Sequence, residues 1–94
     1  MPSATLQRIA PYIGDDAAET LADLEMVTGD DDPGGENFDL GCAAYWYAAN
    51  YHGGQSTDLY RLLTAVDYHP GPLESGPDDS ARVWYDAMRD IIGK

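Results

Sequence analysis

Apolar side chains recur at helical spacing along most of the chain. The first run places four of them on one side of a predicted helix: Leu6, Ile9, Ala10 and Ile13. Ser3 or Thr5 can cap this helix, because both offer a side-chain oxygen to the first free amides. Pro11 is expected to kink or end it, because proline has no amide hydrogen and clashes with the preceding turn.

A second helix is predicted over residues 16–28, before a glycine. Asp16 and Glu19 form a D-x-x-E variant of the capping box at its start. One face carries positions that recur at the 3.6-residue period: Ala17, Leu21, Leu24 and Thr28. Asp16, Glu19 and Asp23 fall on the opposite face, and Glu25 lies at its flank.

The most apolar segment, residues 38–52, predicts a third helix. It follows a loop, residues 29–36, that is marked by its Pro-Gly-Gly and its charge. Asn37 or Asp39 can cap the helix, and two glycines end it. Its side chains are apolar or aromatic on all sides, which is typical of the buried centre of a domain. We therefore expect this helix, which contains Tyr45 and Trp46, to be central.

Two further helices are predicted in the second half of the chain. The fourth begins at Ser56 or Thr57 and carries an apolar stripe: Leu59, Leu62, Leu63 and Val66. The fifth follows a loop rich in proline and glycine, with Ser75 and Asp78 as its capping residues. Its apolar face consists of Ala81, Trp84, Met88 and Ile91. The pattern predicts a single all-α domain over residues 1–94, a bundle of four to five short helices whose core comes mainly from residues 40–68 and 80–92.

The charge of the chain is strongly negative and unevenly placed. Its 94 residues include 17 acidic and 5 basic side chains, for a formal net charge of −12. Residues 1–40 hold ten acids against Arg8 alone, a net of −9, and residues 41–94 net only −3. Such a chain is a poor direct ligand for nucleic acid or anionic lipid, because both need cationic counter-surfaces.

Length and composition also bear on where the protein acts. The longest apolar run has eight residues, whereas a membrane-spanning helix needs about 20. The N-terminus shows no basic start followed by an apolar stretch, so no signal peptide is expected. The single cysteine fits a reducing compartment. We predict a cytoplasmic protein without membrane contact, as a monomer or small homo-oligomer.

The chain offers few groups for catalysis or metal binding. Cys42 is a candidate nucleophile with His52 or His69 as its base, but a small thiol in the most apolar helix is more often part of the core. A calcium-binding loop that starts at Asp30 does not fit the EF-hand spacing, because its positions five and twelve are Gly34 and Gly41. An irregular carboxylate site for a cation stays a secondary alternative. No zinc spacing and no phosphate-binding glycine motif occurs. We predict that the protein is not an enzyme and uses no cofactor or metal.

The acidic segment, residues 15–39, contains no base and is the candidate binding surface. Its predicted partner-binding residues are Asp15, Asp16, Glu19, Asp23, Glu25, Asp30, Asp31, Asp32, Glu36 and Asp39. Carboxylates three or four residues apart on a helix stand about 5–6 Å from one another. This spacing is comparable to that of phosphates along a nucleic-acid strand. Tyrosines expected at the surface can add aromatic contacts: Tyr12, Tyr60 and Tyr68.

In size, acidity and lack of catalytic motifs, the chain resembles small phage-encoded inhibitors of the DNA-mimic anti-CRISPR and anti-restriction type. The resemblance is one of class and covers no shared motif. It implies an inhibitor that occupies the nucleic-acid site of a basic partner, such as a CRISPR effector complex or a restriction nuclease. Two alternatives stay open: an antitoxin or immunity protein that neutralises a basic nuclease, and an adaptor or structural domain whose acidity is an adaptation to salt.

Overall fold

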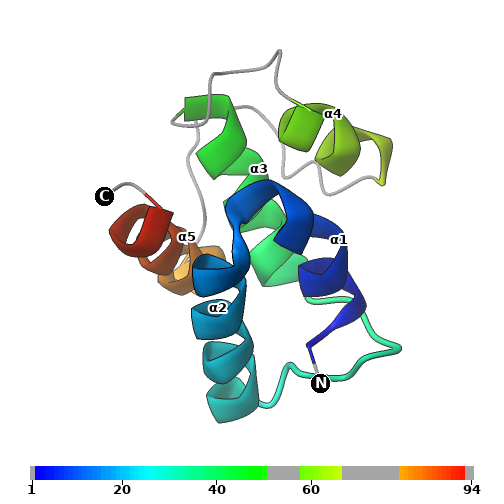
Figure 1. Ribbon diagram of the computed structural model, residues 1–94, viewed down its shortest axis with the longest axis vertical. Coiled ribbons are helices and arrows are strands. Elements are labelled where there is room, and N and C mark those ends of the chain that lie inside the picture. Colours follow the sequence, from blue (N-terminus) through cyan, green and yellow to red (C-terminus); the bar gives the residue numbers. More distant parts are fainter. Residues whose placement is uncertain (1, 51–57, 67–78, 93–94) are drawn as a thin grey trace.

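The protein is a bundle of short helices (Figure 1). The computed structural model describes residues 2–50, 58–66 and 79–92. Its helices are α1 (Ala4–Ile13), α2 (Asp15–Thr28), α3 (Phe38–Asn50), α4 (Asp58–Ala65) and α5 (Asp79–Ile92). These described ranges contain no strand. The prediction of a small all-α bundle is confirmed.

Helix α3 lies at the centre and packs against α1, α4 and α5, while α2 packs against α1 and α5 (Figure 1). More than half of the α3 side chains are buried: Leu40, Gly41, Ala43, Ala44, Tyr45, Trp46, Tyr47 and Ala48. The glycine and alanines let neighbouring helices approach closely, and the aromatic rings fill the remaining space. The prediction of a central, apolar, aromatic-rich helix is confirmed.

The core draws on all of the helices. The fully buried residues include Leu59, Leu63 and Met88 from α4 and α5, as the sequence predicts. They also include Leu6 and Ile9 of α1, and α2 contributes Leu21. Helices α1 and α2 therefore supply part of the core that was predicted to come mainly from residues 40–68 and 80–92.

Helices α1 and α2 are joined by one residue, Gly14. Ser3 caps α1, because its hydroxyl accepts a hydrogen bond from the amide of Leu6. Pro11 lies inside α1, which continues for two more residues. Gly14 then has φ 93° and ψ 159°, a backbone region essentially restricted to glycine. The predicted capping box at Asp16 is wrong, because α2 already begins at Asp15 and no side chain caps it.

Asn37 is the capping residue of α3. Its Oδ1 accepts a hydrogen bond of 3.1 Å from the amide of Leu40, which decides between the two caps that the sequence allowed. The other predicted helix boundaries fall on residues 51–57 and 67–78. These boundaries, with His52, His69 and Tyr68, lie outside the described residues.

Candidate functional site

The outer side of α2 carries four carboxylates, which we call the acidic face: Asp15, Asp16, Glu19 and Asp23. All four are exposed, whereas Ala17 and Leu21 on the opposite side of the helix are buried. Glu19 lies four residues after Asp15 and three after Asp16, and Asp23 lies four residues after Glu19, so Glu19 shares one surface with the other three carboxylates. Asp15 and Asp16 also stand in the first turn, where the positive end of the helix dipole favours an acid. The predicted apolar side of this helix is confirmed at Ala17 and Leu21, whereas Thr28, which was predicted on the same side, is exposed.

The loop after α2 is held by its own hydrogen bonds. Asp32 Oδ1 accepts from the amide of Gly34 at 3.0 Å, and Asp30 Oδ2 accepts from the hydroxyl of Thr28 at 2.8 Å. The amide of Ala4 donates to the carbonyl of Gly35 at 2.9 Å, which ties the loop to the start of α1. Asp30 and Asp32 are exposed and Asp31 is half-buried. These three residues therefore extend the acidic surface from a loop of defined conformation.

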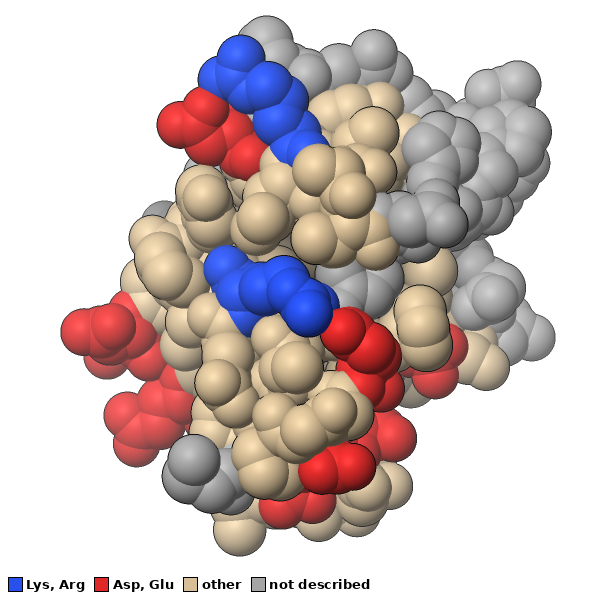
Figure 2. All heavy atoms as spheres, turned by 90° about the vertical axis from the view of Figure 1, so that its right-hand side faces the viewer, with Lys and Arg blue, Asp and Glu red and all other residues tan. Residues whose placement is uncertain are grey.

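Glu36 differs from the other acids of the loop, because its charge has a basic partner within the chain. Its Oε2 lies 2.9 Å from Arg8 Nη1 and accepts a hydrogen bond of 2.8 Å from Thr5 Oγ1. Figure 2 shows this side of the molecule, where basic side chains lie against acidic ones and further acidic side chains flank a broad uncharged area. Asp39, half-buried, lies in the first turn of α3. Glu36 and Asp39 thus present less unopposed charge than the acidic face.

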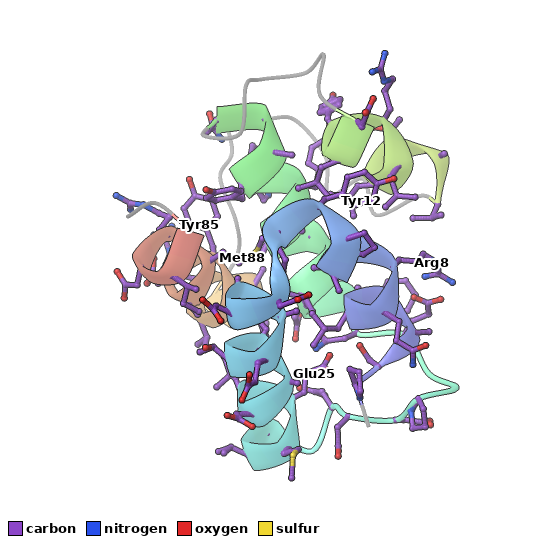
Figure 3. All side chains as sticks on the ribbon, in the orientation of Figure 1. Arg8, Tyr12, Glu25, Tyr85 and Met88 are labelled. Atoms are coloured by element: carbon purple, nitrogen blue, oxygen red, sulfur yellow. The ribbon has the colours of Figure 1, made fainter. Side chains whose placement is uncertain are left out.

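Glu25 does not belong to this surface, and its predicted role in partner binding is wrong. Its side chain is fully buried and points from α2 toward the start of α1 (Figure 3). One carboxylate oxygen accepts from the Ser3 amide at 2.8 Å. The other accepts from the Ser3 hydroxyl at 2.5 Å and from Asn37 Nδ2 at 2.8 Å. A buried carboxylate that meets three donors is part of the fold, because exposing it would leave all three without their acceptor.

The two residues that Glu25 holds are helix caps. Ser3 caps α1 and Asn37 caps α3. Asn37 donates to the carboxylate of Glu25 from its Nδ2, and Ser3 donates from its backbone amide and from the same hydroxyl that caps α1. The charge therefore lies beside the N-terminal ends of two helices, whose dipoles favour a negative group. We call Ser3, Glu25 and Asn37 the cap cluster. A signal for it was present in the sequence, since Glu25 lies four residues after Leu21 on the buried side of α2.

The tyrosines predicted at the surface differ in their surroundings. Tyr12 is exposed, as expected. Tyr60 is half-buried, and its hydroxyl oxygen lies 2.9 Å from that of Tyr45, with which it shares a hydrogen bond. Burial, and then this hydrogen bond, raise the pKa of Tyr45 to about 12. Burial also raises the pKa of Tyr47. Tyr60 therefore joins α4 to α3, and the prediction that it is exposed is wrong.

The candidate nucleophile and the candidate metal ligands lie as follows in the described part of the chain. Cys42 is half-buried on α3. Within residues 2–50, 58–66 and 79–92, no three His, Cys, Asp or Glu side chains are arranged to hold a metal ion. None of the helices in these ranges combines the length and apolar character that crossing a membrane requires.

In comparisons with known proteins, no family model matches the chain, and no curated protein or solved structure matches it. Fold and site together define a small all-α protein with an acidic helix face.

Proposed function

We propose that the protein is a non-enzymatic inhibitor that acts in the cytoplasm of a bacterial cell and occupies the nucleic-acid site of a basic partner. Examples of such a partner are a CRISPR effector complex and a restriction nuclease. The observation that carries the proposal is the acidic face, four exposed carboxylates in line on one rigid helix. Asp30, Asp31 and Asp32 extend it.

The spacing of these charges supports mimicry of a phosphate backbone. The acidic face runs from Asp15 to Asp23, nine residues of α2, which corresponds to about 12 Å along a helix axis. Phosphates on one strand of DNA rise about 3.4 Å per nucleotide. The face thus offers a line of negative charge over the length of a few nucleotides. A groove lined by Lys and Arg would attract it from a distance, and added salt would weaken the attraction.

Capture of partners from bacterial lysate at low and high salt tests this function. The tagged protein is expected to retain a nucleic-acid-handling protein at low salt and to lose most of it at high salt. Adding duplex DNA should displace the captured partner, because both ligands would use one site. A partner that stays bound in the presence of excess DNA would contradict the mimicry. A captured nuclease toxin would favour the antitoxin alternative.

Two variants with equal changes in net charge locate the site. The first neutralises the acidic face with Asp16→Asn, Glu19→Gln and Asp23→Asn. The second neutralises three exposed acids on other helices, with Asp58→Asn, Asp86→Asn and Asp90→Asn. Capture is expected to fail with the first variant and to persist with the second. Equal loss in both would show that net charge alone, rather than the acidic face, drives binding.

A further inference from the structure

Two adjacent apolar side chains stand exposed at the end of α2. Met26 has 63% of its surface accessible and Val27 has 84%, the highest value among the large hydrophobic residues that the structure describes as exposed. Isolated exposed apolar residues are ordinary on protein surfaces. Here two neighbours expose most of their surface within one turn of a helix, and neither belongs to the hydrophobic core or to the partly buried residues packed against it.

These two side chains continue the line of the acidic face. Met26 and Val27 lie three and four residues after Asp23, the two spacings that make side chains neighbours on a helix surface. From Asp15 to Val27 the line covers about 18 Å of helix. One surface thus begins with carboxylates and ends with two apolar side chains.

The helix turn that presents the apolar pair is fixed by the cap cluster. Glu25 precedes the pair directly, and its buried carboxylate is bonded to Ser3 and Asn37. Gly29, with φ 82°, closes the same turn in the left-handed conformation, and its amide donates to the carbonyl of Glu25. A surface that is already ordered loses little conformational freedom on binding.

The composition of this surface points to one kind of occupant. A second copy of the chain would bring carboxylates against carboxylates, and an anionic membrane would repel them. A basic groove bordered by an apolar pocket complements both parts. We propose that the outer side of α2 is a composite docking surface, whose acidic face lies in the basic groove of a nucleic-acid-binding protein while Met26 and Val27 enter an apolar pocket at the end of that groove.

This inference rests on the proposed function and adds a division of roles. The carboxylates accelerate association and make it sensitive to salt, because charge acts at a distance. The apolar pair slows dissociation, because separating the partners would return the buried apolar surface of both side chains to water. Binding should therefore weaken with salt but keep a residual component that depends on Met26 and Val27.

Two synthetic peptides provide defined probes. One is a helical peptide with lysines along one face and leucines beside them at one end of that face; the other has serine in place of each leucine. Isothermal titration and methyl and amide NMR shifts measure binding to the wild-type chain. The leucine peptide is expected to bind at least about tenfold more tightly than the serine peptide. It should shift the Met26 and Val27 methyl signals together with the Asp23 amide.

The variant Met26→Ser/Val27→Ser is expected to remove this preference and leave the salt dependence unchanged. Val83→Ser is the matched control, since Val83 is 55% exposed on α5, and it should bind both peptides as the wild type does. Far-UV circular dichroism verifies that both variants are folded.

Three results would overturn the inference. If the serine peptide binds as tightly as the leucine peptide, the inference fails while the proposed charge recognition stands. If neither peptide binds, the proposed function fails as well. If light scattering shows self-association that Met26→Ser/Val27→Ser abolishes, the occupant is a second copy of the chain.

Discussion

Glu25 and Ser3 are joined by two hydrogen bonds although 22 residues separate them in the chain. Both the amide and the hydroxyl of Ser3 donate to the Glu25 carboxylate, and Asn37 donates to it as well. The last turn of α2 is thereby fastened to the first turns of α1 and α3. The cap cluster is thus a fixed point of the fold close to the surface that we propose for binding.

Replacing Glu25 tests how much the cap cluster contributes to the free energy of unfolding. Glu25→Gln is expected to lower the free energy of unfolding by about 1–3 kcal/mol, because the new amide group would face donors instead of accepting from them. Glu25→Ala should lower it further, because it leaves three donors without an acceptor. Urea denaturation followed by circular dichroism measures both.

The cap cluster is also expected to act as a unit. The effects of Ser3→Ala and Glu25→Gln should not add, because each removes the same Ser3 hydroxyl bond. A double-mutant cycle measures this coupling in the same denaturation experiment. Additive effects would mean that the bond makes no contribution to stability.

Neutralising Glu19 is expected to have the opposite effect to neutralising Glu25. Glu19 has like-charged neighbours at Asp15, Asp16 and Asp23, and each such pair costs about 0.2–0.5 kcal/mol. Glu19→Gln should therefore stabilise the chain in dilute buffer by about 0.6–1.5 kcal/mol, as measured by thermal melting. The gain should vanish in 1 M salt, where charges are screened beyond about 3 Å.

Thermal melting of the wild-type chain in dilute buffer and in molar salt tests adaptation to salt. A protein adapted to brine would unfold in dilute buffer, whereas we expect this domain to melt cooperatively there. Its core is built mainly from apolar side chains of the described helices, and burial of apolar surface stabilises the fold without any ion. A chain that folds only at molar salt would favour adaptive acidity over a specific binding surface.

Gly14 offers a test of backbone conformation without side-chain contacts. A β-carbon at this position meets no atom within 4 Å, so the cost of Gly14→Ala comes from its positive φ alone. We expect a loss of about 1–3 kcal/mol in stability. Gly34→Ala is the matched control, because its nearest contact is an ordinary 3.8 Å and its φ is not positive. Thermal melts should separate the two, and equal melting temperatures would contradict the strain at Gly14.

The pair of Tyr45 and Tyr60 predicts a dependence on high pH. The pKa of Tyr45 is about 12 in the folded protein, against an ordinary value of 10.0. Below pH 10 the tyrosine is protonated in both states and its contribution to stability is fully present. As the pH rises from 10 to 12, the unfolded chain releases the proton while the folded chain keeps it, so the free energy of unfolding falls.

An NMR titration that follows the ring-carbon signal of Tyr45 resolves its transition from those of the other six tyrosines. Tyr60→Phe should lower the pKa of Tyr45, because it removes the shared hydrogen bond. The pKa should remain above its ordinary value, because burial is the larger cause. An unchanged pKa of Tyr45 in Tyr60→Phe would mean that the hydroxyl pair does not form in solution.

Much of the helical architecture followed from local pattern. The apolar periodicity placed Leu59 and Leu63 in the core, and the lack of a polar side placed α3 at the centre. Both predictions succeed because they depend on helix geometry and on the burial of apolar surface, which can be inferred from residues close in sequence. The acidic face was equally readable, since it needs only the spacing of Asp16, Glu19 and Asp23.

The burial of Glu25 was decided by the tertiary structure, although its spacing from Leu21 was a signal for the buried side of α2. Its charge predicted an exposed position like that of the other acids of α2. The helical spacing also allowed an apolar stripe through Leu24 and Thr28 instead of through Glu25, although Thr28 is exposed in the structure. Burying the carboxylate became favourable only when α1 and α3 brought Ser3 and Asn37 to it, two groups distant in sequence. The sequence by itself determined the helices and the face that carries the charge. The tertiary structure decided which carboxylates stay outside, because only the packed chain supplies the donors that a buried charge requires.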